Sequence, residues 1–118
     1  GFIGHMKNIL NASKVSAKIN YSEIPIIDKV KMLSTAKNWS SGAINNQKSL
    51  NNKILWNKSI TLSEKMILFD PQTSGGLLFT VDKSISKEFQ KKLSENNNLI
   101  VKKVGEIVSK SNFEIEFL

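Results

Sequence analysis

Asp70-Pro71-Gln72-Thr73-Ser74-Gly75-Gly76-Leu77-Leu78-Phe79-Thr80-Val81 is the stretch on which the expected fold of this chain depends. Its first half favours a turn, because Asp-Pro starts turns, Thr and Ser hydroxyls bond nearby backbone, and glycine tolerates positive φ. Its second half alternates as strands do, with Leu77, Phe79 and Val81 on one face. We therefore predict a loop over 70–76 that runs into an inner strand, covered on both sides, over 76–81.

The predicted loop is a candidate binding site for an anion. Backbone N–H groups and two hydroxyls can converge there on a phosphate, so the candidate residues are Thr73, Ser74, Gly75 and Gly76. Equally, the two hydroxyls could do no more than satisfy the turn. Asp70 is a carboxylate of the kind that binds Mg²⁺, but an Asp before Pro is more typical of a turn.

The nine residues from Asp70 to Leu78 resemble the signature of the C-terminal domain of selenophosphate synthetases (selenide, water dikinases). This family belongs to the aminoimidazole ribonucleotide synthetase-like superfamily. The segments 1–5 and 23–27 are also similar to it, with Gly1, Gly4 and His5 matching. Over 38–60 the chain departs from the family's Pro-Gly-Gly-Thr…Arg-Asn segment, since only Gly42 and Asn46 match. A contact made by the family's arginine is therefore not implied for this chain.

The resemblance implies an ATP-dependent phosphotransferase that makes selenophosphate, AMP and phosphate from ATP, selenide and water with Mg²⁺. We expect a cytoplasmic protein, with which the absence of cysteine agrees. It also implies that the reactive Cys or selenocysteine, an essential Lys and most metal-binding aspartates lie in an N-terminal domain. We therefore expect residues 1–118 to be a single domain and the C-terminal fragment of a longer two-domain enzyme. In that case the fragment supports the cleft, and the missing N-terminal domain is its partner.

On this interpretation the fragment has no catalytic and no metal-binding residue of its own. We expect it to be inactive alone and to bind neither ATP nor Mg²⁺ without the rest of the enzyme. Members of the family commonly dimerise, chiefly through the N-terminal domain, which allows a homodimer of the full-length enzyme. The alternative is a stand-alone module of the same fold that binds an anion or a nucleotide.

Composition excludes several other kinds of site and partner. The chain has no cysteine, so it contains no disulfide, thiolate metal site or cysteine nucleophile. No apolar run approaches the roughly 20 residues of a membrane span. His5, the single histidine, is interpreted as a packed or capping residue.

The charge pattern argues against nucleic acid as a partner. The formal net charge is +7, yet every basic residue is a lysine and none is an arginine. Base readout and bidentate phosphate contacts depend heavily on the guanidinium group. We therefore interpret the lysines mainly as a solvated surface, which leaves a positive field able to attract small anions.

The remaining pattern predicts an α+β fold, a mixed sheet with helices packed on it. Expected helices cover 1–12, 25–36, 61–69 after a Thr61–Glu64 capping box, and 85–98, the last ended by Asn96 to Asn98. Expected strands cover 15–20 and, as an antiparallel hairpin, 99–108 and 113–118. The polar stretch 38–60 is expected to be a functional loop or disordered, with Trp39 pinning its start to the core.

Overall fold

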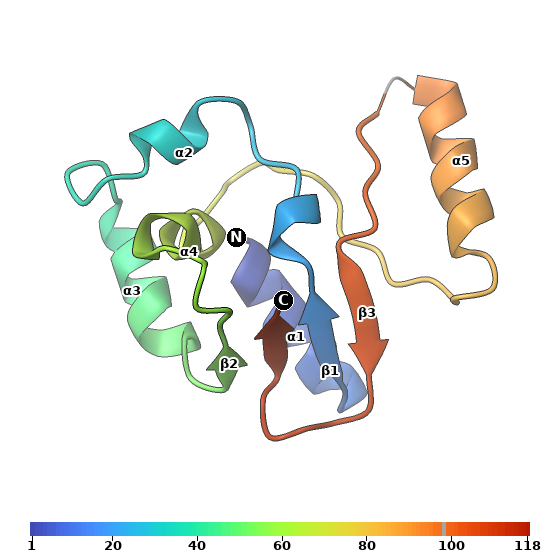
Figure 1. Cartoon of the computed structure of the whole chain (residues 1–118), viewed down its shortest axis with the longest axis horizontal. Helices are drawn as coiled ribbons and strands as arrows, with labels where there is room; N and C mark the ends of the chain where they lie inside the picture. Colours follow the sequence, from blue (N-terminus) through green and yellow to red (C-terminus); the bar gives the residue numbers. More distant parts are fainter. Residues whose placement is uncertain (98) are drawn as a thin grey trace.

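The computed structural model describes residues 1–97 and 99–118. Helices and short strands are interspersed along the chain (Figure 1). In chain order the elements are α1 (Phe2–Ser13), β1 (Ser16–Ile19), the short 3₁₀ helix η1 (Tyr21–Glu23), α2 (Val30–Leu33), α3 (Ser41–Leu50), β2 (Ile54–Leu55), α4 (Leu62–Phe69), α5 (Ser86–Asn97), β3 (Gly105–Val108) and β4 (Ile115–Phe117). The predicted end of the last helix includes Asn98, which lies outside the described residues.

Within the described residues the strands form one four-stranded sheet in the order β2-β4-β1-β3. β4 is parallel to both β1 and β2, whereas β3 is antiparallel to β1. On one face Ala17 lies between Ile107 and Ile115, and on the other Lys18 lies between Glu106 and Glu116. A mixed sheet with one apolar face and helices packed on it confirms the α+β prediction.

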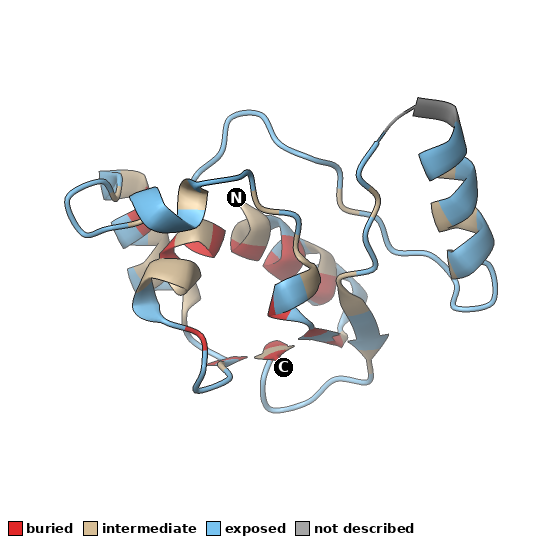
Figure 2. Cartoon of the chain, turned by 45° about the horizontal axis from the view of Figure 1, so that its top comes forward, coloured by how far each residue is buried: buried red, intermediate tan, exposed pale blue. Residues whose placement is uncertain are grey.

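Helices α1 and α4 supply most of the core that covers the apolar face of the sheet. Their buried surfaces face inward in Figure 2. The apolar residues buried there are Ile3, Met6 and Leu10 of α1 and Met66, Leu68 and Phe69 of α4. Trp56 extends this core, because its ring stacks on Phe117 with centroids 4.3 Å apart. Helical spacing and the capping box therefore identified the two helices that build the core.

The strand predicted over 76–81 is wrong, because these residues belong to no strand. Leu77 is 83% exposed and Phe79 is 55% exposed, while Leu78 packs against the core. A strand of this composition is stabilised by cross-strand neighbours and by burial. Among the described residues β3 pairs with β1 alone, so its outer edge gives 76–81 no ladder. The alternating apolar pattern is therefore present in 76–81, but no strand among the described residues pairs with this segment.

The predicted C-terminal hairpin is also wrong. β1 lies between β3 and β4 in the sheet, so the last two strands do not pair with each other. Ala17 of β1 has strand neighbours on both sides and is only 1% exposed, because it lies on the apolar face of the sheet that the core covers. The first of the two strands is shorter than expected and begins at Gly105, where a Cβ would collide with the backbone oxygen of Lys18.

Two further expectations between residues 25 and 60 are corrected. The helix predicted over 25–36 shrinks to α2, where the apolar residue Leu33 is 62% exposed. Lys29 has a left-handed φ of 68°, which interrupts any helix entering from Pro25. The polar stretch 38–60 is neither a loop nor disordered throughout, since it contains α3 and β2. Trp39 packs against the core as predicted.

Candidate functional site

Three segments far apart in sequence meet where α4 ends and the Asp70–Gly76 loop begins. Gly1 at the start of α1 lies against the backbone of Asp70. The Ser40 hydroxyl at the start of α3 lies 3.4 Å from Asp70 Oδ1. The Asn46 side chain donates a hydrogen bond of 2.8 Å to the carbonyl oxygen of Phe69. The base of the loop is therefore held from two helices, α1 and α3.

Glycines make this close approach feasible. A Cβ on Gly42 would lie 2.6 Å from Cγ of Pro71, and a Cβ on Gly1 would collide with the carbonyl oxygen of Asp70. By contrast, a Cβ on Gly4 would make an ordinary contact of 3.7 Å with Leu50 Cδ1. Gly1 and Gly42 are two of the positions at which this chain matches the family pattern. They are also the residues that pack on Asp70 and Pro71.

The candidate residues Thr73, Ser74, Gly75 and Gly76 follow this base and are all exposed. Within the described chain the hydroxyls of Thr73 and Ser74 bond no protein group. Gly75 and Gly76 do not use the positive φ that glycine tolerates, since no described glycine has one. A Cβ on Gly76 would meet nothing within 4 Å, so this part of the loop is open to solvent.

The loop presents donors without charge. The Gln72 N–H donates a hydrogen bond of 3.0 Å to the carbonyl oxygen of Asp70. Residues 73–76 make no further backbone hydrogen bond within the described residues. Two free hydroxyls and consecutive free N–H groups are the groups that surround phosphate oxygens in other anion sites. The loop therefore offers donors of the kind that anion sites use, but it contains neither a nucleophile activated by a base nor a general acid.

The described residues contain no group of three or more His, Cys, Asp or Glu side chains able to hold a metal ion. Asp70 ends α4 half-buried, beside Ser40. His5, expected to be packed or capping, lies exposed on α1. Neither side chain has the partners that a metal centre requires.

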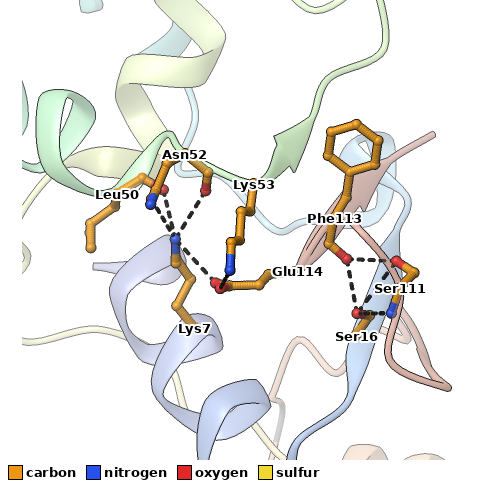
Figure 3. Close-up of polar contacts among 8 residues, drawn as sticks. All are labelled: Lys7, Ser16, Leu50, Asn52, Lys53, Ser111, Phe113 and Glu114. Atoms are coloured by element: carbon orange, nitrogen blue, oxygen red, sulfur yellow. Dashed lines mark hydrogen bonds and ion pairs between the residues drawn. The ribbon is translucent and has the colours of Figure 1, made fainter.

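A buried ion pair, which the sequence did not reveal, fixes α1 against the sheet (Figure 3). The Lys7 ammonium lies 3.1 Å from Glu114 Oε2 and donates to the carbonyl oxygens of Leu50 and Asn52, each at 3.1 Å. One signal for it was available, because Lys7 follows Ile3 by four residues and so falls on the buried face of α1.

Ser16 is a second buried polar group in Figure 3. Its hydroxyl donates 2.9 Å to the carbonyl oxygen of Phe113 and accepts 3.0 Å from the Ser111 N–H. The turn between β3 and β4 is thereby fastened to β1. Nothing in the pattern of the sequence indicates this contact.

Two ionisable groups near α4 have shifted pKa values. The Thr61 backbone N–H bonds the Glu64 carboxylate and lowers the pKa of Glu64, to which the Thr61 hydroxyl and the Lys31 ammonium contribute. Burial raises the pKa of Tyr21 to about 12, and the nearby Glu64 carboxylate adds to the rise. Tyr21 therefore stays a neutral phenol, unsuited to act as a base.

Comparison with known proteins gives one family. The chain matches the model of AIR synthase related protein, C-terminal domain, over residues 1–117. It is 34% identical over 118 residues to a selenide, water dikinase of Sulfurovum sp. and 36% identical over 118 residues to one of Campylobacter jejuni. A third, from Clostridioides difficile, is 30% identical over 118 residues.

These matches cover 100%, 98% and 100% of this chain but 33%, 32% and 34% of the three relatives. The chain therefore spans about a third of the length of the curated relatives it matches. Among the described residues, no helix has both the length and the apolar character needed to cross a bilayer.

Proposed function

Because this chain belongs to the AIR synthase related family, whose C-terminal domain it matches, we propose that it is the C-terminal domain of a selenide, water dikinase. The observation that carries the proposal is the sequence identity of 30–36% to enzymes of that name over nearly the whole chain. The full-length polypeptide, meaning this chain with the sequence that precedes it in the same reading frame, would make selenophosphate, AMP and phosphate from ATP, selenide and water. Its proposed compartment is the cytoplasm.

In this proposal the Asp70–Gly76 loop contacts a phosphate of the nucleotide or product. Free hydroxyls on Thr73 and Ser74 and free backbone N–H groups to Gly76 support that role. The net charge of +7 attracts a polyphosphate to this domain. Phosphoryl transfer depends mainly on positioning and charge neutralisation, so a loop without a reactive group can still contribute.

Mg²⁺, which the family implies, does not fit this chain alone. The described residues offer no cluster of three ligand side chains, whether around Asp70 or elsewhere. We therefore assign the metal, the essential Lys and the reactive Cys or selenocysteine to the rest of the full-length polypeptide. The contribution proposed for the loop is limited to binding and orienting a phosphate.

The partner in this proposal is the part of the polypeptide that the relatives have and this sequence lacks. Leu77, Phe79 and Val81 are 83%, 55% and 39% exposed in the segment that follows the loop. Contiguous exposed apolar surface marks an interaction site in soluble proteins. We propose that the N-terminal domain covers these three side chains, and that the homodimer expected of the family forms through that domain.

The test measures AMP and phosphate released from ATP in the presence and absence of selenide. We expect selenide-dependent release by the full-length polypeptide and none by the 118-residue chain. Release by the 118-residue chain would show that it has reactive groups of its own. No release by the full-length polypeptide would overturn the assignment as a dikinase.

A second candidate is a stand-alone module that binds an anion or a nucleotide. It is favoured by the loop donors, which are free without any partner domain. The coding region upstream of Gly1 separates the two functions. An open frame containing a glycine-rich segment with Cys or an in-frame stop codon supports the dikinase, whereas a start codon directly before Gly1 supports the module.

A further inference from the structure

We propose that Gly1 and Gly42 are positioning residues, which set the path of the Asp70–Gly76 loop because their lack of a side chain lets two helices press on its base. The inference rests on the proposed function, since it takes the loop to contact a phosphate. It adds to that function two residues that do not themselves touch the ligand.

Gly42 is placed where helix stability alone would favour another residue. It is the second residue of α3, after Ser41, with Ser40 as the N-cap. In a helix, alanine is in general more favourable than glycine. At this position, however, a Cβ would lie 2.6 Å from Pro71 Cγ, and a change of ring pucker is the only side-chain motion that can move this atom. A methyl group at 42 must therefore displace Pro71 or α3.

Gly1, at the start of α1, packs in the same way against Asp70, the residue before Pro71. A Cβ there would collide with the carbonyl oxygen of Asp70 and would lie 3.6 Å from the carbonyl oxygen of Leu68. Both are backbone oxygens, so the main chain around the end of α4 must itself shift to make room for a Cβ. Consecutive loop residues, Asp70 and Pro71, are thus each held against a glycine of a different helix, α1 or α3.

A displacement at Pro71 is passed to the candidate residues because little else fixes them. Past the Gln72 N–H, which bonds the Asp70 carbonyl, 73–76 make no backbone bond to the rest of the described chain. A hydrogen bond weakens steeply when its distance and angle leave the favoured range, so displaced donors bind a phosphate less well. Gly42→Ala should therefore weaken phosphate contact without removing any donor.

The chain offers a matched control and a rescue. Gly4→Ala places the same methyl group in α1 at an ordinary 3.7 Å from Leu50 Cδ1, so the loop should not move. Pro71→Ala in the Gly42→Ala background removes Cγ, the atom at 2.6 Å, and leaves Pro71 Cβ as an alanine methyl that was 3.6 Å away. The double variant should therefore restore the path of the loop.

The experiment measures ATP affinity of the full-length polypeptide by calorimetry without selenide, and backbone amide shifts of residues 72–76 in the 118-residue chain. We expect Gly42→Ala to weaken ATP binding at least about tenfold and to move the loop resonances, Gly4→Ala to change neither, and Gly42→Ala with Pro71→Ala to recover both. Equal ATP affinity for Gly42→Ala and Gly4→Ala, or failure of the double variant to recover, would overturn the proposal.

These outcomes are separable from those that test the function. If the full-length polypeptide binds ATP but releases no AMP with selenide, the assignment as a dikinase falls and the affinities still decide the role of Gly42. If it is active but Gly42→Ala binds ATP as the unsubstituted protein does, the positioning role falls and the function stands. A melting curve of each variant identifies any loss caused by unfolding.

Discussion

The ammonium group of Lys7 lies 3.1 Å from the carboxylate of Glu114, and each side chain is only 9% exposed. The pair joins α1 to the residue that precedes β4, across more than a hundred positions of sequence. Removing two charges from water is costly, and their attraction compensates only when the remaining donors are also bonded. Lys7 meets this condition, because it also donates to Leu50 and Asn52. The pair therefore fixes where α1 sits on the sheet.

Replacing Glu114 by Gln keeps the shape of the side chain but leaves Lys7 as a buried charge without a counter-charge. Breaking a buried pair in this way costs about 3–5 kcal/mol, so we expect the free energy of unfolding in urea to fall by about 3 kcal/mol. Glu116→Gln is the control, since the Lys18–Glu116 pair at 3.4 Å is 50% and 35% exposed. It should cost less than about 1 kcal/mol. Equal losses would show that burial does not distinguish the two pairs.

The capping box at the start of α4 gives a second prediction. The Thr61 hydroxyl accepts from the Glu64 N–H at 3.3 Å, while the Glu64 carboxylate accepts from the Thr61 N–H at 3.0 Å. Thr61→Ala removes the first bond and should destabilise the chain by about 1 kcal/mol, measured by thermal or urea unfolding. Thr61→Ser retains a hydroxyl and is the control. A cost for Thr61→Ser as large as that for Thr61→Ala would contradict the role of the cap.

The lowered pKa of Glu64 predicts how stability depends on pH. The carboxylate is stabilised as an anion in the folded state, first by the Thr61 backbone N–H. Its contribution is therefore complete above the ordinary pKa of 4.5 and is lost as pH falls through the lower pKa of the folded state. In Glu64→Gln the group does not titrate, so the difference in melting temperature from the unsubstituted chain should shrink below pH 4.5. A difference that stays constant well below that pH would assign the effect elsewhere.

Local signals in the sequence predicted the elements that carry their own stabilisation. The spacing of Ile3, Met6 and Leu10 gave α1, and Thr61 with Glu64 gave α4, because a helix closes its hydrogen bonds within a few residues. The segment 76–81 has an equally clear strand pattern, yet a strand needs a partner that the pattern does not name. Its ladder therefore could not be deduced from composition alone.

The candidate site was predictable in part for the same reason. The string from Asp70 to Gly76 nominated the loop, but sequence spacing does not show that Gly1 and Gly42 press on its base. α3, which carries Gly42, is polar and buries only Ala43, so no apolar period revealed it. This helix is stabilised by the Ser40 cap, which is a local contact, and by packing against α4, which forms only in the folded chain.

The exposed segment after the loop gives a test of the proposed partner domain. Leu77 is 83% exposed, so Leu77→Ser should change the stability of the 118-residue chain by less than about 0.5 kcal/mol. In the full-length polypeptide we expect amide exchange of 76–81 to be slower and Leu77→Ser to lower the melting temperature. Met32→Ser, at a side chain 79% exposed on α2, is the control and should alter neither protein. Unchanged exchange of 76–81 in the longer protein would remove this surface from the interface.

The hydroxyls of the loop separate binding from stability most directly. Thr73 and Ser74 are exposed and bond no other described group, so alanine at both should leave the unfolding free energy within about 0.5 kcal/mol. If these hydroxyls contact a phosphate, each lost bond to a charged group is worth about 1.5–3 kcal/mol. Calorimetry on the full-length polypeptide should then show ATP affinity reduced by at least about tenfold for either single variant. Thr80→Ala, also exposed and beyond the loop, is the matched control. ATP affinity that is the same for Thr73→Ala, Ser74→Ala and Thr80→Ala would leave the loop without a ligand.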